Sequence, residues 1–281
     1  MERVPTTVTA VTPPTPAERR LLARDQFAVL GDLLNERTFH HILALGIREG
    51  WHCWEAGAGA ASVPSWLAER VGSRGRVLAS DIDTSALEDA ENRPFEVRRH
   101  DLTVDSPPAA EFDLVHARLV LEHLSDPSAA LATLVAALRP GGWLLVETSD
   151  PMLAPSACPD ETGPDQALAN KLRAAVWSAM ATRTDMSLGR TLPRRLRAAG
   201  LSSVGAEVAF ALGGPGARHM QRTLVTRARP ALIGAGSATG EEIDRHLADL
   251  DTAQLDIAVF PIVSAWGRNP VDRSANRTAR A

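Results

Sequence analysis

The residues best suited to chemistry begin at Glu55, an acidic residue that follows a short apolar run and precedes Gly57 and Gly59. Glycines at such a turn let the backbone pass close to a ligand, because a side chain there would collide with it. A strand that ends on an acidic residue, turns on glycines and opens a helix is typical of nucleotide-cofactor sites in doubly wound sheets. Many α/β turns use glycine only to reverse direction, so this turn alone is weakly diagnostic.

Two further carboxylates follow the next two expected strands. Asp81 comes after the strand expected over 76–80, and Asp101 comes after the one expected over 95–99. A carboxylate at the first position can accept both hydroxyls of a ribose, and one at the second can accept the exocyclic amine of adenine. The alternative is that these residues cap helices, which suits Asp83 better than Asp81. We therefore favour an adenosine site.

The elements that must position these residues alternate between strand and helix. Apolar runs predict five strands, around 51–55, 76–80, 95–99, 112–117 and 143–147. Periodic apolar residues predict helices over 63–71, 84–90 and 127–138, and residues 139–142 are expected to form a turn. Such alternation requires a parallel sheet with helices on both faces. Right-handed crossovers then bring the carboxyl ends of the strands to one edge, where ligands bind.

The regions on either side are expected to be mainly helical. Residues 1–16 are proline-rich and predict a disordered tail, and helical spacing predicts two helices within 17–45 that could form a lid. A cofactor-binding half at 46–150 would precede a cap at 151–200, final strands with a helical insertion at 201–270, and a flexible tail at 271–281. The later elements are expected as helices over 166–181, 191–199, 218–227 and 241–250, and strands over 203–210 and 257–266.

The composition is that of an ordinary soluble globular protein, with 281 residues of which 44% are hydrophobic and 23% charged. A net charge of −4 offers no basic surface for nucleic acid or an anionic membrane, and no segment is typical of a membrane span or a signal peptide. Cys53 and Cys158 are too few for a disulfide framework or a zinc site. We expect a cytoplasmic protein with no metal and no nucleic-acid or membrane partner, and we leave a homodimer open.

Five motifs, in order, resemble those of class I S-adenosylmethionine-dependent methyltransferases. They are Glu55-Ala-Gly57-Ala-Gly59, Asp81-Ile82-Asp83, Arg99-His100-Asp101-Leu102, the segment from Phe112 to Leu124, and the segment from Leu138 to Trp143. The resemblance is good over 45–150 and looser over 203–266, and Ala61 replaces a third glycine that the family often has. It implies a doubly wound, Rossmann-like α/β sheet of seven strands, ordered 3-2-1-4-5-7-6, with the last strand antiparallel.

The resemblance also implies which residues bind S-adenosylmethionine, whose product is S-adenosylhomocysteine. The glycine turn would contact the amino-acid portion, Asp81 the ribose, and Asp101 with Leu102 the adenine. The end of the fourth strand would lie beneath the sulfonium and open towards the acceptor. The full set of expected cofactor residues is Glu55, Gly57, Ala58, Gly59, Asp81, Ile82, Asp101, Leu102, His116 and Arg118.

A nicotinamide-dependent dehydrogenase is the rival interpretation of the glycine turn. That fold requires a third glycine where this chain has Ser62, so that a pyrophosphate can approach the helix N-terminus. Glu55 is also an anion, which is poorly placed beside a pyrophosphate but well placed near a cationic cofactor. The methyltransferase interpretation is therefore preferred.

Methyl transfer from a sulfonium is an in-line displacement, so the enzyme mainly holds the nucleophile, the methyl group and the sulfur in a row. A histidine or a carboxylate could take the proton that leaves an O–H, N–H or aromatic C–H acceptor. Two candidates, Glu122 and His123, follow the fourth strand, and two more, His40 and His41, lie on the N-terminal helices. A simpler alternative for His123 is a structural role.

Four residues in the two helical insertions are candidates for the acceptor pocket: Trp177, Met180, His219 and Met220. For Trp177 and Met180 the simpler alternative is core packing of a cap helix. An apolar cap with few charges nevertheless suggests a small aromatic or heteroaromatic acceptor in secondary metabolism, such as antibiotic biosynthesis. Methylation at O, N or C stays open. So do a cofactor-binding protein with a non-methylating, pericyclase-like role and a macromolecule methyltransferase, although the latter lacks the expected basic face.

Overall fold

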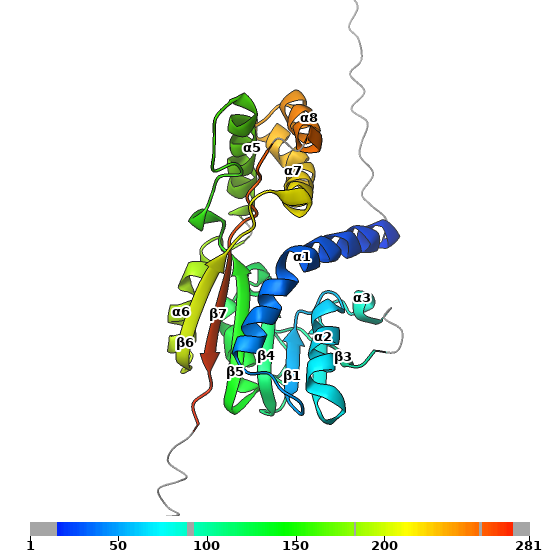
Figure 1. Ribbon diagram of the computed structural model, residues 1–281, viewed down its shortest axis with the longest axis vertical. Coiled ribbons are helices and arrows are strands. Elements are labelled where there is room, and N and C mark those ends of the chain that lie inside the picture. The colour runs from blue at the N-terminus through cyan, green and yellow to red at the C-terminus, as the bar shows by residue number, and fades with distance from the viewer. Residues whose placement is uncertain (1–15, 89–92, 183, 253–254, 272–281) are drawn as a thin grey trace, which may run out of the picture.

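The computed structural model describes residues 16–88, 93–182, 184–252 and 255–271, and it contains one mixed sheet with a group of helices beyond its upper end (Figure 1). The strands are β1 (His52–Ala56), β2 (Arg76–Asp81), β3 (Glu96–Arg99), β4 (Phe112–Arg118), β5 (Leu138–Ser149), β6 (Ser202–Ala209) and β7 (Ile262–Arg268). Their order is β3-β2-β1-β4-β5-β7-β6, and β7 is antiparallel to both of its neighbours. The predicted fold and strand order are confirmed.

Helices cover both faces of this sheet and form the cap. They are α1 (Pro16–Ala44), α2 (Ser62–Val71), α3 (Ser85–Glu88), α4 (Pro127–Ala136), α5 (Pro164–Met180), α6 (Leu188–Ala198), α7 (Gly214–Gly234) and α8 (Gly240–Asp249). Short 3-10 turns at Gly72–Arg74, Leu121–His123, Pro151–Leu153 and Leu250–Thr252 complete the described elements. Local signals explain several helix starts: the Asp126 side chain accepts from two backbone N–H groups at the start of α4, and Thr239 and Glu242 form a capping box in α8.

The alternation of side chains along the strands divides the core into two layers. Trp54 on β1 points to the face covered by α4 and α6, where it packs with Phe112 and Leu144. Cys53, its neighbour, points to the other face, which is covered by α2 and by the end of α1 around Ile42. Because successive strand residues face opposite ways, Glu55 shares the α1 side with Cys53.

The cap has a hydrophobic core of its own, built by α5, α7 and α8. Trp177, Met220 and Ile243 belong to it, as does Phe260 from the segment that enters β7. Figure 1 shows this cap beyond the end of the sheet at which β5 finishes and β7 begins. The described helices include none long and apolar enough to cross a membrane.

Some element boundaries differ from the expectation. Residues 17–45 were expected to hold two helices, but α1 is continuous, because no proline interrupts its interior. The expected turn at 139–142 is part of β5, which pairs with β4 through a register shift. The last strand begins at Ile262 instead of 257, since residues 255–260 pack with the cap and Pro261 has no N–H for the ladder. The expected tail at 1–16 lies outside the described residues except for Pro16, and the tail at 271–281 lies outside them except for Val271.

Candidate active site

The glycine turn after β1 packs against the segment that follows β4. Gly57 and Gly59 have φ values of 70° and 57°, in the left-handed region that glycine adopts without strain. A Cβ atom on Gly57 would lie 2.2 Å from a methyl carbon of Val120. The backbone N–H groups of Gly57 and Ala58 donate to the carbonyl of Ser80 at 2.8 and 2.9 Å. The turn is therefore held by β2 and leaves no room for a side chain at Gly57.

Asp81 connects this turn to the expected ribose site. Its Oδ2 accepts from the Gly59 N–H at 2.8 Å, and its Oδ1 accepts from the Asp83 N–H at 3.1 Å. A carboxylate has about four lone-pair positions, so Asp81 retains capacity for two hydroxyls. Ile82 beside it is 58% exposed and offers an apolar surface to a flat base. These residues fit an adenosyl group.

A cavity of about 280 Å³ lies between the glycine turn and α1. Small side chains leave this space open, and its lining residues are Ala28, Gly31, Asp32, Asn35, Ala60, Ser62 and Ala86. They come from α1, from the region where the turn enters α2, and from α3. α1 therefore lies over the expected cofactor site, in the position that a lid would occupy.

The expected adenine residues divide between the surface and the core. Asp101 Oδ1 accepts from the N–H and the hydroxyl of Thr103, at 2.8 and 2.6 Å, and these bonds lower the pKa of Asp101. Leu102 is only 7% exposed and packs with the α4-side core. The contact of either residue with adenine stays a prediction.

A buried row of polar side chains crosses the sheet beneath α1. Glu55 on β1 is in register with His116 on β4, and Glu147 on β5 is in register with Ser264 on β7. The His116 ring lies between the two carboxylates, with Nδ1 2.6 Å from Glu55 Oε2 and Nε2 3.2 Å from Glu147 Oε2. Ser264 donates its hydroxyl to Glu147 Oε1 at 2.6 Å. Glu55 and His116, both expected at the cofactor, are thus engaged with each other.

The charges of this row are set by mutual contact. Burial by itself lowers the pKa of His116, but the charges and hydrogen bonds of Glu55 and Glu147 outweigh it and raise the pKa to about 9. Burial opposes ionisation of Glu147, yet contacts with His116, Ser264 and Thr38 lower its pKa to about 2. The two carboxylates thus favour the protonated form of His116, and both of its ring nitrogens are engaged by them.

The same row fastens α1 to the carboxyl edge of the sheet. Thr38 on α1 donates its hydroxyl to Glu147 Oε2 in a short hydrogen bond. Arg118, at the end of β4, donates to Thr38 Oγ1 at 2.8 Å and to Asn35 Oδ1 at 3.0 Å. Sequence reasoning missed Asn35, Thr38, Glu147 and Ser264. A signal existed for Glu147, a lone acidic residue in an apolar strand.

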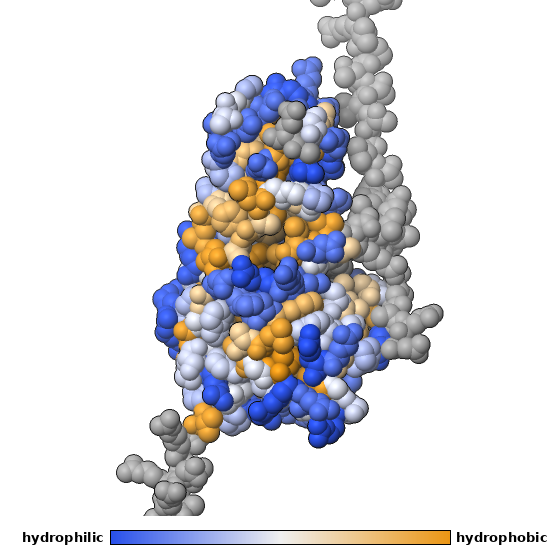
Figure 2. Space-filling model, in the orientation of Figure 1, coloured by the Kyte–Doolittle hydropathy of each residue, from blue (hydrophilic) through white to orange (hydrophobic). Residues whose placement is uncertain are grey.

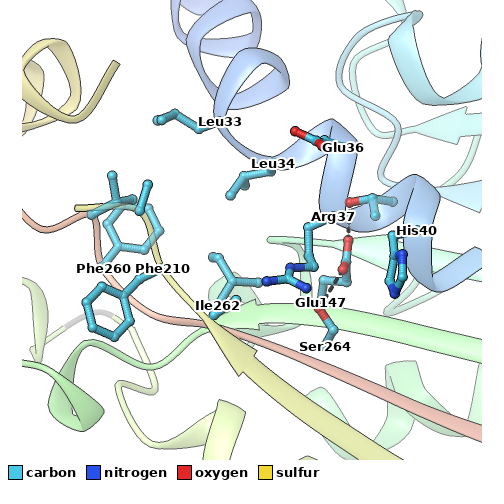
Figure 3. Close-up of a pocket in the computed structure, with 14 residues that line it drawn as sticks. Leu33, Leu34, Glu36, Arg37, His40, Glu147, Phe210, Phe260, Ile262 and Ser264 are labelled. Atoms are coloured by element: carbon cyan, nitrogen blue, oxygen red, sulfur yellow. Dashed lines mark hydrogen bonds between the residues drawn. The ribbon is translucent and has the colours of Figure 1, made fainter. Parts of the chain in front are cut away.

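A larger cavity of about 390 Å³ lies at the carboxyl edge of β5 and β6, where β7 begins. Figure 3 shows α1 along one side, with Phe210 and Phe260 forming an apolar wall, Arg37, His40 and Glu147 on the other side, and Ile262 between them, next to Arg37. The remaining lining residues are Leu33, Leu34, Glu36, Thr38, Ala209, Ala211, Val259 and Ser264. Figure 2 shows hydrophobic surface gathered around a hollow between the cap and the sheet.

The four candidate bases occupy different environments. His40 is exposed and lines the larger cavity. His41 is buried, its ring lies 5.5 Å from that of Trp266, and burial lowers its pKa. Glu122 is buried and its Oε1 accepts from the N–H and hydroxyl of Ser149, whereas His123 is exposed in the turn after β4. The structure thus brings one of the four, His40, to the larger cavity.

The four candidate acceptor residues lie away from both cavities. Trp177 and Met220 are buried in the cap core, Met180 packs at its edge, and His219 is exposed. Core packing therefore accounts for Trp177, Met180 and Met220. Trp177 does not line the larger cavity, but its ring packs edge-on against that of Phe260, which does, with centroids 6.1 Å apart. In the described part of the chain, no three His, Cys, Asp or Glu side chains are grouped as metal ligands would be.

Comparison with known proteins gives matches that agree with this geometry. A family profile described as a methyltransferase domain matches residues 25–204. The methyltransferase str2 of Strobilurus tenacellus is 38% identical over 80 residues, which are 26% of this chain and 29% of that protein. The ubiquinone/menaquinone biosynthesis C-methyltransferase UbiE of Nitrosospira multiformis is 31% identical over 107 residues, 36% of this chain and 44% of that protein. The chain thus spans less than half the length of either relative.

Solved structures resemble this chain in fold. A Bacillus halodurans protein described as a methyltransferase has a TM-score of 0.51 at 13% identity, covering 82% of this chain and 96% of that one. The YcgJ protein of Bacillus subtilis has a TM-score of 0.50 at 14% identity, with the same two coverages of 82% and 96%. Because the family profile matches more than half of the sequence and the sheet order is the expected one, this chain belongs to the class I S-adenosylmethionine-dependent methyltransferase family.

Proposed function

We propose that this protein transfers the methyl group of S-adenosylmethionine to a small aromatic or heteroaromatic natural product bound in the larger cavity. The observation that carries the proposal is the position of the two cavities. One lies over the glycine turn beyond β1, and the other lies over the ends of β5 and β6 and the start of β7. In the sheet, β4 lies between β1 and β5. The end of β4, where the family places the sulfonium, therefore separates donor from acceptor.

The backbone at the end of β4 supports this location. Leu119 has a φ of 56°, a left-handed conformation that costs a non-glycine residue about 1–2 kcal/mol. Its N–H donates to the carbonyl of Glu147 at 2.8 Å, which holds the strained residue against β5. Such strained residues gather at functional sites, where the surrounding structure maintains them.

The lining of the larger cavity supports a small, mainly apolar acceptor. Phe210, Phe260 and Ile262 can pack on the faces of an aromatic ring, and the volume is near the lower end of the range for small-molecule sites, about 300–1,000 Å³. The name of the UbiE relative also provides a precedent for a small-molecule acceptor. His40 is the side chain that we assign to accept a proton from an O–H or N–H acceptor, since it is exposed at this cavity.

Binding of S-adenosylhomocysteine to an Asp81→Asn variant tests the donor site. The amide cannot accept both ribose hydroxyls as the carboxylate can, so calorimetry should show at least a tenfold weaker affinity, about 1.4 kcal/mol. Glu241→Gln, which removes an exposed carboxylate in the cap, is the matched control and should bind as the wild type does. Unchanged affinity in the Asp81 variant would place the ribose elsewhere.

Transfer of a labelled methyl group to a panel of aromatic phenols, amines and heteroaromatic compounds tests the reaction. Label in a small-molecule product supports the proposal. Cofactor binding without transfer to any compound would favour a non-methylating role, and label in RNA or protein would favour a macromolecule methyltransferase. The last two outcomes each contradict the proposal.

A further inference from the structure

We propose that Arg37 binds a carboxylate of the acceptor, so that the acceptors of this enzyme are aromatic acids. The inference rests on the function proposed above, because it concerns the same cavity. It adds the charge of the acceptor to that function, because the cavity could hold an aromatic ring whether or not the ring carries a carboxylate.

Arg37 extends from α1 along the polar side of the larger cavity. In Figure 3 its guanidinium reaches from the helix towards Ile262 and Glu147, opposite the two phenylalanines. Its Nη1 lies 2.8 Å from Glu207 Oε1 on β6, and the two side chains are 48% and 39% exposed. This ion pair connects the lid helix to the edge strand beside the cavity.

The ion pair leaves most of the guanidinium available. A guanidinium has five N–H donors in a planar fork that matches a carboxylate with two parallel hydrogen bonds. Among the described residues, Glu207 is the one ion-pair partner found for Arg37, and the contact is through a single nitrogen. Exposed pairs of this kind contribute little stability. A ligand carboxylate that binds the guanidinium through two parallel hydrogen bonds can therefore compete with Glu207.

The other charged groups at the cavity do not neutralise Arg37. Glu147 is already engaged by His116, Thr38 and Ser264 through hydrogen bonds. Glu36 is exposed and leaves α1 in a different direction from Arg37 in Figure 3. The cavity thus presents an available guanidinium opposite an apolar wall, which is complementary to a molecule with an aromatic body and one carboxylate.

The test compares acids with matched neutral compounds. Binding of 2-naphthoate and indole-3-carboxylate, each paired with its primary amide, is measured by calorimetry on the full chain with S-adenosylhomocysteine present. We expect each acid to bind at least tenfold more tightly than its amide. Arg37→Gln should remove this preference while the amides still bind, and Glu207→Gln should strengthen acid binding, because the competing carboxylate is gone.

A charge-reversed pair keeps the connection between α1 and β6 but changes its polarity. In the double variant Arg37→Glu with Glu207→Arg, the preference should move from 2-naphthoate to 2-naphthylmethylamine. Arg74→Gln removes another exposed ion pair, with Glu49, and serves as the control that should leave acid binding unchanged. Thermal unfolding of each variant shows that it remains folded.

The possible outcomes distinguish an error in the role of Arg37 from an error in the proposed acceptor cavity. If acids and amides bind equally to the wild type, or if Arg37→Gln keeps the preference for acids, the role of Arg37 is wrong and the acceptor cavity stands. If neither acids nor amides bind while S-adenosylhomocysteine does, the assignment of the cavity is wrong, and both proposals fail.

Discussion

The glycine turn and the larger cavity lie on either side of the end of β4, yet the chain builds them in different ways. The turn, Asp81 and Asp101 come from consecutive strand-and-turn units within 52–105. The cavity takes its residues from α1, from Glu147 on β5, from the end of β6 and from the start of β7 with the segment before it, which are about 50 to 230 residues apart. A local site leaves a local pattern in the sequence. A site assembled from distant segments leaves only scattered apolar residues.

The two regions are joined by the buried row of Glu55, His116 and Glu147. Glu55 precedes the glycine turn by two residues, and Glu147 lines the larger cavity. Thr38 and Arg118 connect the row to α1, which borders both cavities. We infer that the row fixes the position of α1 relative to both sites, so it is the first place to disturb.

Replacing His116 should lower the free energy of unfolding more than any other change considered. His116→Gln leaves two buried carboxylates without their cation, and breaking a buried pair of this kind costs about 3–5 kcal/mol of unfolding free energy. Urea denaturation measures the change, and His123→Gln, at an exposed histidine, is the control. A loss no larger than that of the control would show that the row contributes little to the fold.

The wild type should also lose stability as the pH rises. His116 has a pKa of about 9 in the folded protein against 6.5 unfolded, so its contribution is complete below pH 6.5 and is lost as the pH rises through 9. The loss is on the order of 3 kcal/mol, because one pKa unit corresponds to about 1.4 kcal/mol. Denaturation midpoints across this pH window measure it. The His116→Gln variant should show a flatter profile, and identical profiles would contradict the assignment.

Gly57→Ala should affect the cofactor side alone. The new Cβ atom meets Val120 in a left-handed backbone conformation, so we expect a loss of about 2 kcal/mol in stability and weaker binding of S-adenosylhomocysteine. Gly46→Ala is the matched control, since Gly46 has a φ of 89° but nothing within 4 Å of a Cβ atom. Binding of aromatic probes should be unchanged, and a parallel loss there would show that the two sites are not separable.

Phe210→Ala should weaken the binding of aromatic probes without changing cofactor binding. Its effect should be smaller than that of the variants above. The ring is 47% exposed, so its removal should weaken binding of an aromatic probe about tenfold, or about 1.4 kcal/mol, with little loss of stability. Leu212→Ala removes a nearby side chain that is 60% exposed and does not line the cavity. Calorimetry with 2-naphthoate compares the two variants. Equal effects would mean that general surface hydrophobicity is being measured.

Much of the fold could be predicted from the sequence, because strand and helix periodicities are local. The order of the sheet followed from the resemblance of the motifs, and the structure has that order. The continuity of α1 and the late start of β7 could not be predicted in this way. Whether a helical pattern runs on, or an apolar segment pairs in the sheet, depends on what packs beside it.

For the site, the sequence by itself determined Gly57, Gly59 and Asp81 as a connected group, because a turn and the next strand end are neighbours in any parallel sheet of this kind. Only the tertiary structure decided that His116 lies between two carboxylates beneath Thr38, since those contacts join residues 31 to 109 positions apart. It also decided that Trp177 and Met220 lie inside the cap core, whereas Phe210 lines the cavity and Phe260 contributes to both. An apolar residue gives the same sequence pattern whether it lies in a core or in a pocket wall. The difference is whether another element fills the space in front of its side chain.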